Sequence, residues 1–294
     1  MATSSTKILD HLVHLTPPGT VEEASQQFRD LGFTVTHGGT HAGGLTANAL
    51  VILGDGAYLE FISFTHPASH YPPGSPDRQK RDANPWAWKA PGWIDYAFLG
   101  SSTVSISNII NERAKQDGSG VRYVPEVDGG RVREDGKMLE WVISAPDEVH
   151  VRGTVPFFCG DVTPRGWRVP TEPPSNSEHP TGAQGVAHVR LLARAESLGS
   201  LSAQLASVVG DPPQVNTMRA EHIWKLKTPS GVPSARKPLL VLSAPKNDDE
   251  EAYLDARGPG IFEIAFLSDA MPFRQAADTI YELEQHRYRS PLIH

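Results

Sequence analysis

The sequence predicts an α+β fold in which β-α-β-β-β modules repeat along the chain and form curled mixed sheets around a cavity. Three observations predict it. Apolar strands and amphipathic helical stretches follow one another in the same order three times, and glycine-rich turns separate the strands. The repeat is about 80–90 residues long, which is too long for a solenoid. Paired modules whose sheets curl around a shared space are therefore expected.

Composition narrows the class of protein. The chain has 294 residues, enough for one large domain or two ordinary ones, and 39% of them are hydrophobic, as in globular proteins. A net charge of -7 argues against nucleic-acid binding, which needs a basic surface. The single cysteine, Cys159, cannot form an intramolecular disulfide, which fits a reducing compartment. The N-terminus has no apolar run typical of a signal peptide or membrane helix, so we expect a cytoplasmic protein without membrane association.

The first module spans residues 8–64. A strand is predicted over Ile8–Leu15, and a helix over Val21–Leu31, with Thr20 as its N-cap and Gly32 at its end. Three further strands are predicted over residues 33–36, 46–53 and 57–63, the last two joined by a Gly-Asp-Gly turn.

The second module spans residues 92–160, and the two modules together form a domain over residues 7–184. Its strands are predicted over residues 93–99, 131–133, 138–144 and 154–158, with a helix over residues 104–115. Long connections at residues 65–91 and 161–184 are rich in proline and glycine, and connections of this length often cover binding sites.

Residues 185–294 are predicted to form a third module with a terminal helix. Its strands are expected over residues 186–192, 221–227, 238–243 and 261–267. Its helices are expected over residues 198–209 and from Pro272 to about Gln285.

Two strands of the first module carry side chains that could bind a metal or transfer a proton. His11 lies in the middle of the first strand and Glu60 in the middle of the last. A carboxylate between apolar neighbours is costly to bury unless it meets a metal, a cation or a hydrogen-bond donor. Together, His11 and Glu60 are two of the ligands that an open metal site needs. Alternatively, His11 is a buried structural histidine and Glu60 faces water; His14 is expected on the opposite face of its strand.

The third module repeats this pattern with His188 on its first strand and Glu263 on its last predicted strand. A metal role for both is one interpretation, and an ion pair of Glu263 with Arg190 or another cation is the other. His222 is a further candidate in this module.

Other residues are candidates for the wall of a pocket. His37, His41 and Asn48 flank a glycine-rich segment that lets the backbone approach a ligand closely, although a flexible hairpin would have the same composition. In the second module, Asp95 on an apolar strand is a candidate base, or a residue that orients a histidine. The remaining candidates for substrate binding are Trp93, Tyr96 and His179.

Several of these segments resemble one known family. They are Asp10-His11-Leu12-Val13, Gly38-Gly39-Thr40-His41, Thr46-Ala47-Asn48, Gly54-Asp55-Gly56 with Tyr58-Leu59-Glu60, Trp93-Ile94-Asp95-Tyr96, Asp135-Gly136, Pro156-Phe157-Phe158 and His179-Pro180. Over roughly residues 8–190 the chain resembles the glyoxalase-like branch of the vicinal oxygen chelate superfamily. That superfamily includes lyases, isomerases, extradiol dioxygenases, thiol transferases and antibiotic-binding proteins.

The resemblance implies metal ligands on the first and last strands of each module. The second module carries Asp95 or Tyr96 and Phe158 or Cys159 at these places, so it lacks the usual histidine and glutamate. Modules one and three would supply His11, Glu60, His188 and Glu263, a set that suits a divalent Zn, Ni, Fe or Mn ion. In that mechanism the metal stabilises an enolate or oxyanion of a small-molecule substrate, while Glu60 or Glu263, after loosening from the metal, or Asp95 or His41 transfers the proton.

Two alternatives stay open. A metal-free member of the superfamily would bind, sequester or rearrange a small molecule, and the incomplete second module favours it. A third possibility is that the paired modules serve mainly for assembly. Modules of this fold work in pairs, so the third module leaves an apolar face that either the terminal helix or a homodimer partner covers.

Overall fold

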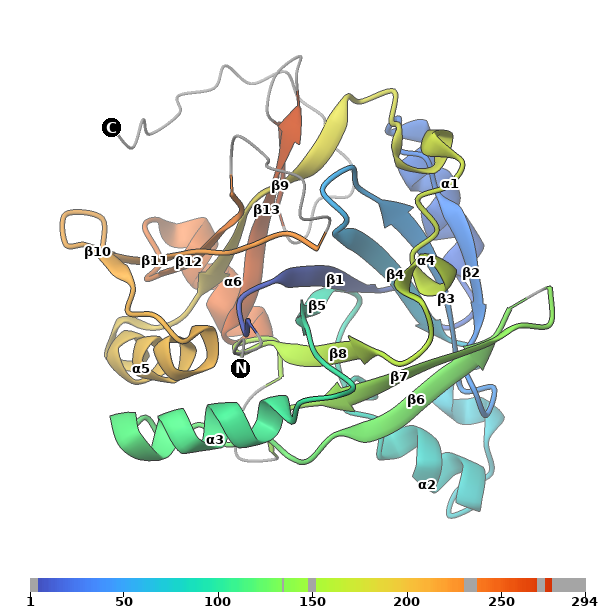
Figure 1. Cartoon of the computed structure of the whole chain (residues 1–294), viewed down its shortest axis with the longest axis horizontal. Coiled ribbons are helices and arrows are strands. Elements are labelled where there is room, and N and C mark those ends of the chain that lie inside the picture. The colour runs from blue at the N-terminus through green and yellow to red at the C-terminus, as the bar shows by residue number, and fades with distance from the viewer. Residues whose placement is uncertain (1–4, 134, 148–151, 230–236, 269–272, 277–294) are drawn as a thin grey trace.

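A computed structural model describes residues 5–133, 135–147, 152–229, 237–268 and 273–276. It confirms the predicted fold class, a mixed α+β architecture with two curled sheets (Figure 1). No helix in these ranges is long and apolar enough to cross a membrane.

The first two modules share one eight-stranded sheet of order β2-β3-β4-β1-β5-β8-β7-β6. Module one consists of β1 (Leu9–Leu15), α1 (Val21–Asp30), β2 (Thr36–Thr40), β3 (Thr46–Ile52) and β4 (Tyr58–Phe64). Module two repeats the order with β5 (Gly92–Leu99), α3 (Ile106–Asp117), β6 (Val127–Val132), β7 (Met138–Ser144) and β8 (Phe157–Asp161). The first strands of the two modules, β1 and β5, pair antiparallel at the centre of the sheet.

The sheet curls until its two edges meet. A backbone bridge joins His41, just after β2, to Arg131 on β6, and the amide of Ala42 donates to the carbonyl of Gly130 at 3.0 Å. Glycine makes the tight wall possible, because a Cβ on Gly38 would lie 2.5 Å from the carbonyl oxygen of Asn48. This closure gives the first sheet an interior lined by both modules.

The second sheet has the order β10-β11-β12-β9-β13-β14. It contains β9 (Ala183–Leu192), α5 (Leu198–Val209), β10 (Gln214–Asn216), β11 (Glu221–Lys225), β12 (Leu239–Ser243), α6 (Asp248–Arg257), β13 (Gly260–Ser268) and β14 (Phe273–Ala276). Strand β13 pairs antiparallel with β9, as β5 does with β1, so Glu263 stands on a strand that follows a complete β-α-β-β-β unit.

The C-terminal helix predicted from Pro272 to Gln285 is wrong where the structure describes it, because Phe273–Ala276 form β14 against β13. The rest of that prediction lies outside the described residues. The homodimer expected at this part of the chain stays a prediction.

The long connections contain short helices that the sequence interpretation left as irregular. They are η1 (Ala68–His70) and α2 (Pro76–Asp82) before β5, α4 (Arg165–Arg168) and η2 (Pro174–Ser177) before β9, and η3 (Ala195–Ser197) before α5. Helix α2 begins with Ser75 as its N-cap and Pro76 in its first turn, which is a favourable start. Both α2 and α4 matter for the site, because segments next to or within them reach the interior of the first sheet.

One apolar core joins the two sheets to helices α1, α3 and α5. Helices α3 and α5 lie side by side in Figure 1, and Ser207 on α5 donates to Asp117 at the end of α3 at 2.8 Å. His14 faces this core, as predicted, with its ring against the edges of Phe61 and Trp93.

Substitution of His14 by Leu is expected to flatten the acid dependence of stability. Burial, with a smaller contribution from Arg257, lowers the pKa of His14 to about 4. Between pH 6.5 and 4 the unfolded chain takes the proton and the folded chain does not, so stability falls as the pH falls. The difference is about 3 kcal/mol between pH 7 and 4.

Urea titrations of both proteins at pH 7, 5.5 and 4 measure this difference. The other titrating groups are common to both proteins and cancel. Parallel dependence on pH in the two proteins would show that the His14 ring is not held neutral.

Candidate functional site

A cavity of about 420 Å³ lies inside the curl of the first sheet. Strands β1, β3, β4, β6, β7 and β8 contribute to its wall, so both modules form it. Its polar lining comprises His11, His41, Thr46, Asn48, Tyr58, Glu60, Asn84, Asp128, Arg131, Cys159 and Arg168. Its apolar lining comprises Ala42, Leu50, Ile62, Trp86, Trp141, Ile143 and Phe157, with the backbone of Gly129 and Gly130.

Strand alternation places Glu60 inside. Tyr58, Glu60 and Ile62 are two residues apart on β4 and all line the cavity, while Leu59 and Phe61 point to the opposite core. The same parity on β1 turns His11 inward. The sequence therefore predicted correctly that His11 and Glu60 would meet.

Three side chains of module one surround the Glu60 carboxylate and form a polar cluster with it. Asn48 donates its amide to Oε1 of Glu60 at 2.5 Å. The other oxygen, Oε2, lies 3.6 Å from Nε2 of His11, and Nε2 of His41 lies 3.8 Å from Oε1. Glu60 is only 6% exposed, so these contacts replace water around it. Three of the residues predicted for this region, Glu60, His41 and Asn48, thus share one wall with His11.

A second layer of charge orients His11. Nδ1 of His11 lies 2.8 Å from Oδ2 of Asp10, which is fully buried and also accepts hydrogen bonds from Arg168. Burial would raise the pKa of the Asp10 carboxyl, but Arg168 and Arg165 outweigh it and hold that pKa well below its usual range. Asp10 is therefore ionised and keeps a proton on Nδ1, which leaves Nε2 facing Glu60.

Three further titratable groups of the wall, His41, Tyr58 and Cys159, are neutral at pH 7. Burial lowers the pKa of His41, although Glu60 opposes the shift. Burial raises the pKa of the Tyr58 phenol well above its usual value, and Tyr58 stacks on His11 with ring centroids 4.6 Å apart. Burial also raises the pKa of the Cys159 thiol to about 12, so this thiol is not a nucleophile at neutral pH.

Other predicted site residues lie outside the cavity wall. Asp95 accepts hydrogen bonds from Trp86 Nε1 and Arg152 Nε, both at 2.9 Å, so it positions a tryptophan of the wall. Trp93 and Tyr96 are buried in the core, and His37 is exposed on β2. His179 accepts from the amide of Thr34 and contacts the carbonyl of Ile52, each at 3.0 Å, which ties the connection before β9 to module one.

His188 and Glu263 form their own pair on the second sheet, with 2.7 Å between Nε2 and Oε1. Arg190 binds Glu250 through two hydrogen bonds of 2.7 Å, and His222 contacts Ser202 at 2.6 Å. The structure therefore brings the four predicted metal ligands together as two separate pairs on two sheets, not as one cluster.

The donor set of this wall offers few ligands for a resident divalent ion. His11, with Asp10 behind it, and Glu60 suit two ligand positions. On the face of module two that corresponds to His11, β5 holds Asp95, which is bound to Trp86 and Arg152, and β8 holds the protonated thiol of Cys159. His11, His41 and Glu60 meet in one wall, but no group of three or more His, Cys, Asp or Glu side chains among the described residues has the arrangement of a metal site. Two guanidinium groups, Arg131 and Arg168, also line the cavity and disfavour a cation. These residues do not fit the metal that the resemblance implies.

Sequence reasoning missed Arg131 and Arg168. One signal was available for Arg131: Gly129-Gly130-Arg131 repeats, in module two, the small-residue pattern that precedes His41 in module one. Arg168 lies in the four-residue helix α4, inside a connection that the sequence did not place against the sheet.

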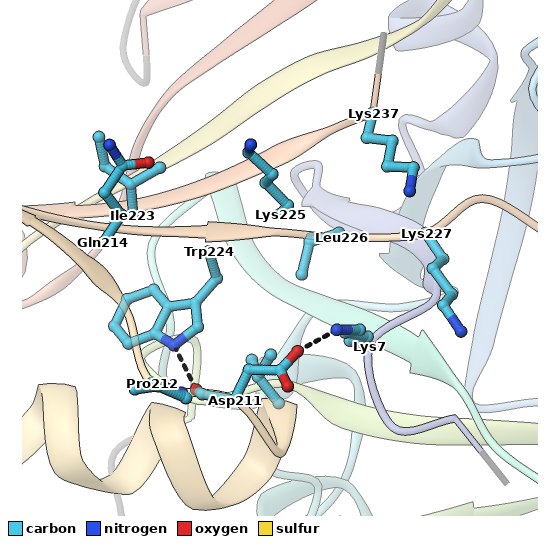
Figure 2. A pocket seen from close by; sticks show the side chains of 11 residues that line it. Lys7, Asp211, Pro212, Gln214, Ile223, Trp224, Lys225, Leu226, Lys227 and Lys237 are labelled. Carbon is cyan, nitrogen blue, oxygen red and sulfur yellow. Dashed lines mark hydrogen bonds and ion pairs between the residues drawn. The ribbon is translucent and has the colours of Figure 1, made fainter. Parts of the chain in front are cut away.

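A second cavity, of about 350 Å³, lies where the N-terminal strand meets the second sheet (Figure 2). Lys7, Lys225, Lys227 and Lys237 border it, and Lys7 forms an ion pair with Asp211, whose carbonyl accepts from Trp224 Nε1 at 3.0 Å. Lys225, Lys227 and Lys237 are exposed, so their charges stay hydrated. The buried acid–base groups belong to the first cavity.

Comparison with known proteins agrees with the fold. A family model described as a glyoxalase-like domain matches residues 9–209. No curated protein matches the chain. A hypothetical protein from Staphylococcus aureus is similar in structure, with a TM-score of 0.55 and 11% identity over 81% of this chain and 86% of that one. A mutant of 4-hydroxymandelate synthase from Streptomyces coelicolor gives a TM-score of 0.50 and 14% identity over 90% and 72%.

At these identities the solved structures show a shared fold alone. The family match supports a stronger conclusion than the shared fold, because it covers more than half of the chain. It spans both modules that enclose the first cavity and continues to the end of α5. The chain therefore belongs to the glyoxalase-like domain family.

Proposed function

We propose that the chain is an enzyme that moves a proton on a small organic molecule bound in the cavity of the first sheet, using its own side chains and no resident metal ion. The observation that carries this proposal is the pair formed by Glu60 and His11. Their facing atoms, Oε2 and Nε2, lie 3.6 Å apart in a nearly dry wall. A carboxylate and an imidazole nitrogen that face each other in this way place two groups able to accept and pass on a proton side by side in one wall.

Glu60 is the proposed base. Asn48 fixes one carboxylate oxygen and leaves the other toward His11 and the cavity. It would take a proton from a carbon next to a carbonyl group and, as the protonated acid, return that proton to the same or the neighbouring position, directly or relayed through His11 or His41, which leaves the site as it began. Asp10 is a positioning residue, because it fixes the His11 tautomer without reaching the cavity itself.

Tyr58 is the proposed donor to the oxygen that becomes negative. Its hydroxyl accepts a hydrogen bond of 2.7 Å from Arg168 and keeps its own proton. A phenol polarised in this way stabilises an enolate by hydrogen bonding. The neighbouring guanidinium of Arg168 adds a fixed positive charge, so this wall supports a developing anion with protein groups alone.

The test is deuterium exchange. Aryl-substituted carbonyl compounds, both acids and neutral ketones, are incubated with the protein in D₂O, and loss of the proton next to the carbonyl is followed by NMR. Exchange above the buffer rate, with at least one compound, is the expected result. A protein that binds these compounds but exchanges no proton would instead be a binding protein, the alternative that shares this cavity.

A further inference from the structure

Arg131 is a buried cation whose polar atoms are not all used. The residue is 4% exposed, and its Nη1 has no hydrogen-bond partner among the described residues. Burial lowers the pKa of Arg131, and the attraction of Glu60 only partly opposes this. A buried guanidinium with an unpaired N–H group is expensive, so such a group in a cavity wall points to a partner that arrives from outside.

Arg168, in the same wall, differs from Arg131 in its hydrogen-bond partners. Its guanidinium binds Asp161 at 2.6 Å, Asp10 at 3.1 Å and the Tyr58 hydroxyl at 2.7 Å. These contacts within the protein account for the burial of the Arg168 guanidinium. Arg131 has no comparable set, although both arginines are equally buried.

A second polar atom of the wall is also unpaired. Oδ1 of Asn48 accepts no hydrogen bond from any described residue, while its amide nitrogen is bound to Glu60. Both atoms lie against glycines that leave space for them. A Cβ on Gly38 would lie 2.1 Å from Asn48 Oδ1, and a Cβ on Gly39 would lie 3.1 Å from Arg131 Nη1. One free donor and one free acceptor therefore flank the same glycine pair.

The rest of the cavity is aromatic. Tyr58, Trp86, Trp141 and Phe157 line it, and its volume of about 420 Å³ is in the lower range of small-molecule sites. The described lining holds two carboxylates, Glu60 and Asp128, and Asp128 is exposed. A ligand with a flat apolar body and one negative group matches this wall.

We infer that Arg131 binds the carboxylate of the substrate, and that the substrates are small aromatic carboxylic acids. A guanidinium fork matches a planar carboxylate, and a hydroxyl or N–H group near the acid would satisfy Asn48 Oδ1. This inference rests on the proposed function, since it names the substrate class of the same cavity. Arg131 anchors the molecule while Glu60 acts on it.

Calorimetric titration of the full chain tests the inference, with phenylacetate, phenylacetamide and phenylphosphonate as probes. Phenylacetate is expected to bind at least about 10-fold more tightly than the amide. Arg131→Met is expected to weaken phenylacetate about 10–100-fold and to change the amide less than about 3-fold. Arg131→Lys, which keeps the charge without the fork, should recover only part of the loss.

Two controls separate the causes. Arg133→Met removes a neighbouring cation whose guanidinium contacts Asp135 and the carbonyl of Trp167, and it should leave all affinities within about 2-fold. Glu60→Gln should still bind phenylacetate while losing deuterium exchange. Thermal unfolding of each variant shows whether it is folded.

Equal affinity of the wild-type protein for acid and amide would overturn the inference, and that result needs no variant. Tighter binding of the phosphonate than of the carboxylate would overturn the carboxylate assignment. If the amide binds as tightly as the acid and neutral ketones exchange deuterium, the proposed function stands while the role of Arg131 fails. If acids bind through Arg131 but no compound exchanges, the proposed function fails and the anchor stands.

Discussion

Substitution of Glu60 by Gln is expected to slow proton exchange about 10²–10⁴-fold, the range that a general base contributes. The amide keeps the size of the side chain and its contact with Asn48, so the cavity wall is preserved. It removes the carboxylate oxygen that faces His11 and could accept a proton from the substrate. The NMR exchange assay measures the rate, and calorimetry measures binding on the same samples.

Glu140→Gln is the matched control for this substitution. Glu140 is an exposed glutamate on β7 that does not line the cavity, so its exchange rate should equal that of the wild-type protein. If Glu60→Gln retained more than about half of the exchange rate, Glu60 would not be the base, and His41 would take its place in the account.

Arg168→Met is expected to lower the free energy of unfolding by about 3–5 kcal/mol, the usual loss when one partner of a buried ion pair is removed. Asp10 has no exposed surface, and without Arg168 its one remaining arginine partner in the described part of the chain is Arg165. The pKa of Asp10 should then rise, and the His11 ring should lose its fixed orientation. Urea unfolding measures the loss.

A double mutant and a surface control show whether the loss of stability comes from the buried charge. Adding Asp10→Asn to Arg168→Met should recover part of the lost stability, because the uncompensated buried charge is gone. Arg29→Met removes a surface pair with Glu22 and should change stability by at most about 1 kcal/mol. A loss below about 1 kcal/mol for Arg168→Met would mean that the charge network does not hold the site.

The sequence predicted those strands whose bounds are set by local residues. β1, β3 and β4 were found near their bounds because apolar runs and the Gly-Asp-Gly turn define them locally. Strand β2 is shifted to Thr36–Thr40, because Phe33 leaves the strand to pack against Phe28 and Phe266. Helix α6 was missed, although Asn247 as N-cap and four acidic residues in its first turn were a readable signal.

The candidate site divides in the same way. Alternation along two strands was enough to bring His11 to Glu60, and the glycine-rich segment brought His41 and Asn48 to the same wall. The arginines depend on the closure of β6 onto β2 and on the path of a long connection, which no local pattern encodes. The pairing of Glu263 with His188 follows from β13 lying beside β9, a matter of sheet order.

Metal content tests the central claim most directly. The claim is that Glu60 and His11 move a proton on the bound substrate without a resident metal ion. Protein purified without an affinity tag or chelator, and shown to exchange deuterium, is analysed for divalent metals by mass spectrometry. The account predicts well under about 0.1 ion per chain, with exchange unchanged after dialysis against a chelator. About one ion per chain, lost together with activity in both His11→Ala and Glu60→Ala, would contradict it and restore a metal mechanism.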